Sequence, residues 1–85
     1  FELRQNYPNP FNPTTIIEYL VPERAQVRLD VFDVTGKQVA ILVDEVKEVG
    51  KYTVSYSGQN LSAGVYFYRL RTGKHSDVKK MTLVK

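Results

Sequence analysis

Hydrophobic and polar residues alternate along much of this chain with a period of two, the pattern that half-buried β-strands show. The clearest stretch is 25–34, in which Val27, Leu29 and Val31 share one face and polar residues occupy the other. Other segments combine alternation with β-branched and aromatic residues, and turn-forming residues separate them. The pattern predicts strands at 14–21, 25–34, 51–55, 65–71 and 75–84.

Residues 38–49 fit two patterns. As a helix, the segment would carry an apolar stripe and end at Gly50 as its C-cap. That stripe consists of Val39, Leu42, Val43, Val46 and Val49. As a strand, it would run over 38–43 and continue into an acidic loop. The run of apolar and β-branched residues from Val39 to Val43 favours the strand.

Turn signals recur at regular intervals between the expected strands. Residues 33–36 begin with Asp33 and end with Gly36, a β-turn pattern in which glycine supplies positive φ. Six or seven short strands at this spacing predict an all-β fold, a small immunoglobulin-like antiparallel β-sandwich. We expect one domain over 1–85, with a proline- and asparagine-rich lead-in segment at 1–13 and the β-sandwich at 14–85. The expected core is Ile17, Tyr19, Val27, Leu29, Val31, Val39, Tyr52, Val54, Tyr66, Tyr68, Leu70, Met81 and Leu83.

Composition limits the possible functions. The chain has 85 residues, of which 42% are hydrophobic and 25% charged, as in ordinary globular domains. It has no cysteine, which excludes disulfides, thiolate metal sites and cysteine nucleophiles. It also has no apolar run of the ~18 residues that a membrane helix needs. We expect the chain to be the end of a longer protein, with any export signal before Phe1.

Charge is distributed unevenly. The net charge is +3, but residues 69–85 carry six Lys or Arg and one Asp, hence +5, and residues 1–68 carry −2. A solvated face on the last two strands explains this excess. The alternative is a contact surface for an acidic partner.

The sequence offers no candidate for catalytic, metal or cofactor chemistry. His75 stands alone, with no nucleophile in the sequence pattern to activate. Asp44, Glu45 and Glu48 form an acidic cluster without the spacing of an EF-hand loop. No glycine-rich phosphate loop is present, and the aromatic residues of 65–71 are expected to be largely buried rather than to stack on nucleic acid. We therefore expect no enzymatic activity, no cofactor, no metal and no nucleic-acid partner.

Two motifs stand out near opposite ends of the chain. The first, at 6–13, places three prolines among three asparagines around Pro8-Asn9-Pro10, which predicts a rigid loop with Phe11 docked on the sandwich. The second, at 58–66, leads through Gly64 into a strand containing Tyr66. Gly64 would let the chain turn or let another backbone approach closely. The Tyr66 hydroxyl needs a polar partner.

These motifs, the hairpin at 29–39 and the basic end at 79–85 resemble the type A C-terminal sorting domain of the type IX (Por) secretion system, over about residues 3–85. The hook-capping immunoglobulin-like domain of flagella is related. Many relatives carry Trp where this chain has Tyr56. The resemblance implies a non-catalytic signal that directs a larger protein through the periplasm to the cell surface or medium. It implies recognition at Pro8, Asn9, Pro10, Asp33, Gly36, Gly64, Tyr66, Lys79, Lys80 and Lys85.

The implied partners are the type IX machinery, a sortase-like protease and the N-terminal cargo of the same polypeptide, with no membrane insertion. The last strand would offer its edge and basic face to a receptor and could pair with a second copy. One alternative is a carbohydrate-binding or cell-attachment module of a secreted enzyme, which would expose a row of aromatic residues on one face. The candidates for that row are Tyr7, Phe11, Phe32 and Phe67. Another alternative is a purely structural immunoglobulin-like domain.

Overall fold

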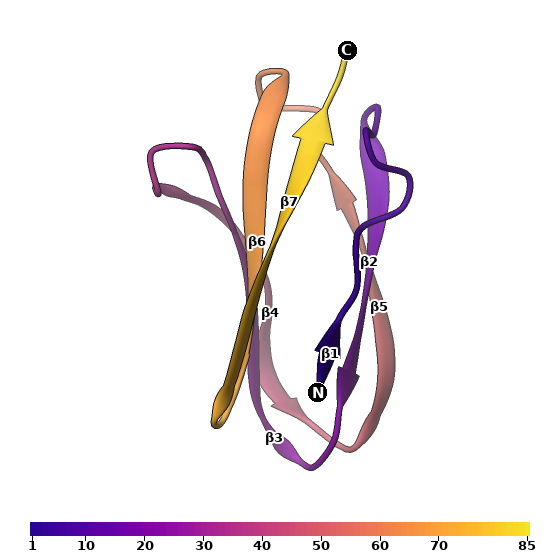
Figure 1. Ribbon diagram of the computed structural model, residues 1–85, viewed down its shortest axis with the longest axis vertical. Helices are drawn as coiled ribbons and strands as arrows, with labels where there is room; N and C mark the ends of the chain where they lie inside the picture. Colours follow the sequence, from indigo (N-terminus) through magenta and orange to yellow (C-terminus); the bar gives the residue numbers. More distant parts are fainter.

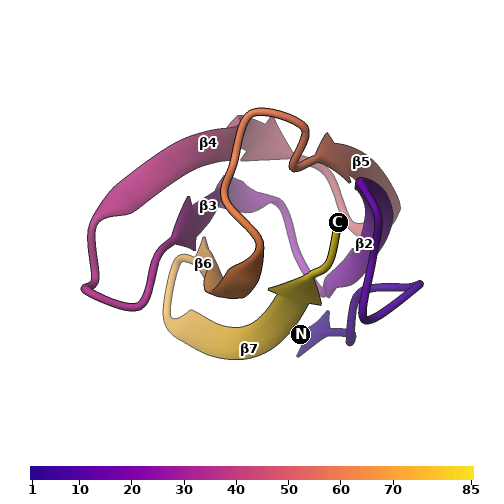
Figure 2. The same cartoon turned by 90° about the horizontal axis from the view of Figure 1, so that it is seen from above.

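Seven strands form two facing antiparallel sheets in the computed structural model, which describes all 85 residues (Figures 1 and 2). The strands are β1 (Glu2–Leu3), β2 (Thr14–Val21), β3 (Ala25–Phe32), β4 (Gln38–Lys47), β5 (Gly50–Ser57), β6 (Gly64–Thr72) and β7 (His75–Leu83). One sheet has the order β1-β2-β5 and the other β4-β3-β6-β7. The predicted all-β antiparallel sandwich is confirmed. The structure contains no helix long and apolar enough to cross a membrane.

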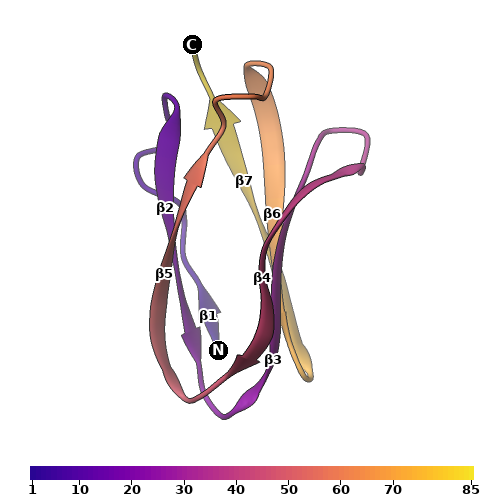
Figure 3. The ribbon, with the colours of Figure 1, turned by 180° about the vertical axis from the view of Figure 1, so that it is seen from behind.

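Short connections carry the chain between the two sheets. Pro22 ends β2, and residues 22–24 lead to β3 in the opposite sheet. Residues 48–49 lead back from β4 to β5, and residues 58–63 cross from β5 to β6 at the other end of the sandwich (Figure 3). The hairpins β3–β4 and β6–β7 stay within the larger sheet. Gly73, at φ +51°, lies in the tight β6–β7 turn.

The core lies between the sheets, where the inward residues of each alternating strand meet. Its buried members are Leu3, Phe11, Ile17, Tyr19, Val21, Val27, Leu29, Val31, Tyr56, Tyr66, Tyr68, Leu70, Met81 and Leu83. Three expected core residues, Val39, Tyr52 and Val54, are only partly buried. They belong to β4 and β5, the edge strands on one open side of the sandwich.

Residues 38–47 form a strand, as favoured, but the acidic loop expected after Val43 is wrong. β4 continues to Lys47 because it stays paired with β3, with Lys47 opposite Ala25. Register shifts opposite Leu29/Asp30 and Val31/Phe32 insert extra residues into β4. Such bulges twist an edge strand and discourage pairing with another chain.

Candidate recognition site

The two end motifs meet at one end of the sandwich. The lead-in segment folds over the start of β2, residues 58–63 cross above the core, and β7 ends beside them, so the C-terminus lies at this end of the sandwich (Figures 1 and 3). β3 also points here, but its turn with β4 splays away on the far side of β6 (Figure 1). Segments more than 50 residues apart in sequence therefore share one surface.

The lead-in segment pairs with the free edge of β7. The Phe11 N–H donates to the Thr82 carbonyl over 2.9 Å, and the Val84 N–H donates to the Phe11 carbonyl over 2.9 Å. The Thr82 N–H donates to Asn9 Oδ1 at 3.0 Å, and Gln5 Nε2 donates to the Lys80 carbonyl at 2.6 Å. The expectation that the whole last strand offers an open edge therefore needs correction. Residues 80–84 are already covered by the chain's own start.

Phe11 closes this end of the core, as expected from its place in the motif. Its side chain is 1% exposed and lies beside Gly58, against which Leu83 also packs. A Cβ added to Gly58 would lie 2.9 Å from Leu83 Cδ2 and 3.3 Å from Phe11 Cε2. The Gly58 N–H donates to the Pro13 carbonyl over 2.7 Å. Gly58 is thus the glycine that close approach requires here, a role that spacing alone did not indicate.

A buried polar network anchors the start of the lead-in segment to β6. The Tyr68 hydroxyl accepts from the Asn6 N–H and donates to the Arg4 carbonyl, both at 2.7 Å. The Asn6 side-chain amide donates to the Pro8 carbonyl at 3.1 Å and to Thr15 Oγ1 at 3.0 Å. Burial raises the pKa of Tyr68 to about 12, so the hydroxyl stays protonated and can donate. The sequence marked Asn6 only as part of a motif and missed Thr15.

The predicted residues Pro8, Asn9 and Pro10 form the outer part of this loop and are exposed. The peptide bonds preceding Pro8, Pro10 and Pro13 are cis. Only Asn9 among the three predicted residues bonds β7 directly, through its side chain. The loop is thus fixed from both sides, by Asn6 within and Asn9 outside.

Gly64, Tyr66 and Lys85 lie at the same end. Gly64 has φ +146° and open space around its missing Cβ, so the turn into β6 requires it rather than close packing. The Tyr66 hydroxyl finds its partner in the Ser62 carbonyl at 2.7 Å. Lys85 Nζ donates to the Gln59 carbonyl at 3.1 Å, which ties the C-terminus to the crossing loop.

The other predicted residues lie elsewhere. Lys79 and Lys80 sit on opposite faces of β7: Lys79 pairs with inward-facing Tyr68, and Lys80 pairs with Phe67 of the outer face. Asp33 serves its own turn, since Oδ1 accepts from the Thr35 N–H at 2.9 Å and the Thr35 hydroxyl at 2.6 Å. The hydroxyl bond holds the pKa of Asp33 below its usual value. Gly36, at φ +86°, completes this turn, as the pattern predicted.

The remaining titratable candidates each contact a neighbouring side chain. His75 stacks on Phe1 with ring centroids 4.9 Å apart. In the acidic cluster, Glu48 pairs with Arg24 and Glu45 with Lys47, each at 2.9 Å. No three His, Cys, Asp or Glu side chains gather in one place.

The four aromatic candidates for a carbohydrate platform do not form one row. Tyr7 is 79% exposed on the lead-in loop, whereas Phe11 is buried in the core. Phe32 and Phe67 pair across β3 and β6 on the outer face of the larger sheet, where both are half-buried. The row of exposed aromatic residues on one face, expected of a sugar-binding module, is therefore not formed by these four side chains.

Two comparisons place this geometry among known proteins. A family model described as a secretion system C-terminal sorting domain matches residues 5–85. Part of PorZ, an essential surface component of the type IX secretion system of Porphyromonas gingivalis, has a similar fold. The TM-score is 0.72 at 18% identity, over 95% of this chain and 11% of PorZ. At that identity the likeness establishes the fold alone. None of the curated proteins matches the sequence.

Proposed function

The chain belongs to the family of secretion system C-terminal sorting domains. We propose that the type IX secretion machinery binds the end of the sandwich where the two motifs meet. As a member of that family, the domain acts as a signal that sends a larger protein through the type IX secretion system to the cell surface or medium.

The convergence of distant motifs is the observation that carries this proposal. Asn9, Phe11 and Gly58 link the lead-in loop, the crossing loop and the end of β7 by hydrogen bonds and close packing. This surface forms only when the whole chain has folded, because its parts come from both ends of the sequence. A receptor that binds it would therefore select folded domains.

Six predicted residues contribute to this surface by exposure or by shape, and we propose that it is the recognised one. They are Pro8, Asn9, Pro10, Gly64, Tyr66 and Lys85. Asp33 and Gly36 shape a separate turn, and Lys79 and Lys80 lie on different faces of β7, so we assign them secondary contacts at most.

Several finer parts of the function remain proposals. We propose that the domain is non-catalytic, that its cargo is the preceding part of the same polypeptide, and that cargo passes through the periplasm. We also propose removal by a sortase-like protease. Pairing with a second copy through β7 would have to use residues before Lys80, since the lead-in segment covers the rest.

Export of a periplasm-targeted fluorescent protein fused to residues 1–85 tests the sorting function. We expect fluorescence at the surface or in the medium of a host with a working type IX system and retention in a host without one. Deleting residues 75–85 should abolish export. Export that is equal in both hosts, or unchanged by the deletion, would contradict the function.

A matched pair of variants tests the proposed surface. Asn9→Ala combined with Lys85→Ala removes two exposed side-chain contacts at the proposed end. Arg24→Ala breaks an exposed ion pair at the opposite end. We expect only the first variant to reduce export while both keep a β-sheet circular dichroism spectrum. Equal export by the two variants would place the recognised surface elsewhere.

A further inference from the structure

Three arginines gather over one buried carboxylate on the outer face of the larger sheet, away from the lead-in loop. Asp30 of β3 is 0% exposed, although it points out of the core. Its Oδ2 lies 3.1 Å from Arg28 Nε, 3.5 Å from Arg69 Nη2 and 3.7 Å from Arg71 Nη2. The three arginine side chains, each partly exposed, therefore cover the carboxylate.

The hydrogen-bonding capacity of this cluster is unequally used. Arg28 has several acceptors, because its guanidinium also donates to Gln38 Oε1 at 3.1 Å and lies 3.8 Å from the Asp44 carboxylate. Arg69 and Arg71 make no side-chain hydrogen bond, and each meets Asp30 only at the longer distances above. A guanidinium has five N–H donors. Arg69 Nε is buried without a hydrogen-bond partner, so the donors left for another anion are those on the terminal nitrogens of Arg69 and on Arg71.

Asp30 holds the three arginine side chains together, because all three contact the same carboxylate oxygen. One buried carboxylate cannot neutralise three guanidinium groups, so the cluster keeps a positive excess. The second oxygen, Oδ1, is buried without a hydrogen-bond partner. Holding flexible arginine side chains in place before binding lowers the entropy lost on binding.

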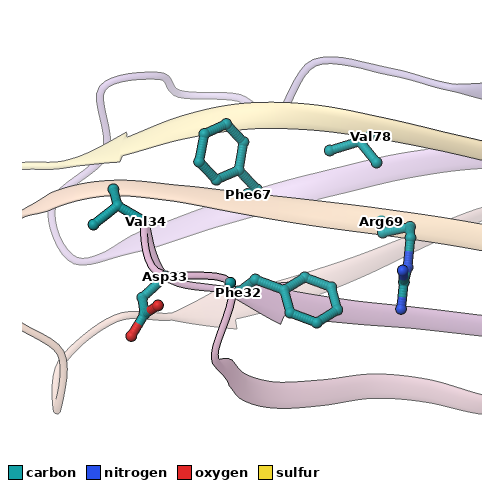
Figure 4. A pocket seen from close by; sticks show the side chains of 7 residues that line it. Phe32, Asp33, Val34, Phe67, Arg69 and Val78 are labelled. Carbon is teal, nitrogen blue, oxygen red and sulfur yellow. The ribbon is translucent and has the colours of Figure 1, made fainter.

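An apolar pocket of ≈ 350 Å³ adjoins the arginines (Figure 4). Its lining includes Phe32, Val34, Phe67 and Val78. Arg69 belongs to both features, since its guanidinium carbon lies 4.8 Å from the Phe32 ring centroid. Asp33 also borders the pocket, but its carboxylate points away from Phe67 and Val78 (Figure 4).

Alternation along β6 sets the spacing of this surface. Phe67, Arg69 and Arg71 are two residues apart and share the outer face, in the order apolar, basic, basic. Side chains on one face of an extended chain repeat about every 6.6–6.8 Å. A second extended chain would match this spacing with an apolar residue followed by two acids, each two residues apart.

We propose that the pocket and the Arg69/Arg71 pair bind an extended acidic segment of a partner protein. Its apolar side chain occupies the pocket, and its carboxylates accept hydrogen bonds from Arg69 and Arg71. Charge complementarity and the apolar pocket together identify this occupant, because an anionic polysaccharide supplies charge but no apolar side chain. The site is distinct from the surface proposed for sorting.

Fluorescence anisotropy of a labelled peptide with the core Phe-Ser-Glu-Ser-Glu, titrated with the 85-residue domain, tests this site. We expect binding that weakens with added salt. A peptide with Gln in place of both Glu should bind at least about tenfold more weakly, from the loss of charge-assisted hydrogen bonds. Because the assay contains no secretion machinery, its failure would leave the sorting function untouched.

Variants separate the site from general charge attraction. Arg69→Gln with Arg71→Gln should weaken peptide binding by about tenfold or more. Arg24→Gln with Lys51→Gln removes the same charge away from the pocket, since Lys51 lies on the other sheet, and should leave binding unchanged. Phe67→Ser should weaken peptide binding without any change in charge. This variant also tests the site if the double arginine variant does not fold. Equal binding of the Glu and Gln peptides, equal effects of the two charge variants, or tighter binding of an anionic polysaccharide would each overturn the proposal.

Discussion

At the scale of single residues, one tyrosine hydroxyl and one missing Cβ hold the lead-in segment in place. Tyr68 bonds Asn6 and Arg4 at once, and Gly58 leaves the space that Leu83 and Phe11 occupy. Neither residue has a reactive role. Each supports the proposed recognition surface by fixing the loop that carries it.

Tyr68→Phe removes the hydroxyl and leaves the buried Asn6 N–H and the Arg4 carbonyl without this partner. We expect a loss of about 1–3 kcal/mol in the free energy of unfolding, the cost of leaving buried polar groups unpaired. Urea denaturation measures it. Tyr7→Phe is the matched control, since Tyr7 is 79% exposed, and an equal loss in both variants would contradict the role of the network.

Gly58→Ala places a methyl group 2.9 Å from Leu83 Cδ2 inside a packed core. We expect about 1–3 kcal/mol of destabilisation from overpacking. Adding Leu83→Val should recover part of that loss, because it removes a methylene at the point of contact. A double-mutant cycle from urea melts measures the coupling. Strict additivity of the two substitutions would show that the contact is not the cause.

At the scale of elements, the lead-in segment acts as a partial extra strand on β7. Edge strands invite pairing with other chains, and a covering segment reduces that risk. Here the covering segment also carries the first motif, so protection of the edge and presentation of the motif depend on the same hydrogen bonds. The edge of β4 is managed differently, by bulges.

Phe11→Ala should detach this segment, because the ring is 1% exposed and closes the core. We expect a loss of about 3–5 kcal/mol in unfolding free energy. Amide hydrogen exchange at Val84, whose N–H donates to the Phe11 carbonyl, should accelerate more than exchange at the β3–β6 pairing. The control is Val34→Ala, at a 69% exposed position. Unchanged exchange at Val84 would show that the segment stays docked without its anchor.

At the scale of the whole molecule, the 85 residues form two sheets around one core that is rich in tyrosine. Small domains bury a limited share of their surface, so each well-packed aromatic residue matters. Burial raises the pKa of Tyr19, Tyr56 and Tyr68, that of Tyr68 to about 12. The core therefore depends on keeping these hydroxyls protonated.

Alkaline pH should destabilise the domain through these tyrosines. In the unfolded chain they lose protons near pH 10, whereas the folded chain retains them, so stability is full below about pH 10 and falls between about 10 and 12. Urea melts at pH 9, 10 and 11 measure the fall. Tyr68→Phe should show a shallower decline than Tyr7→Phe. A flat profile over this range would contradict the burial argument.

Much of the fold follows from local pattern. Alternation predicted β3, β5, β6 and β7 close to their observed bounds, because the side-chain period of a strand is visible in any short window. Turn chemistry predicted Gly36 at positive φ. The opposite faces of Lys79 and Lys80 also follow from their adjacent positions. β1, with two residues, is too short to give a pattern.

The sequence by itself therefore determined β2, β3, β5, β6 and β7, the all-β class and the presence of the motifs, since period-two patterns and turn residues are local features. Tertiary structure alone decided which motifs meet. The bond from Asn6 to Tyr68 joins residues 62 positions apart, and the bond from Thr82 to Asn9 joins residues 73 apart. Likewise, only the pairing of β3 with β6 buries Asp30 under arginines from both strands. Such contacts depend on how the two sheets pack and pair, which no local window of sequence encodes.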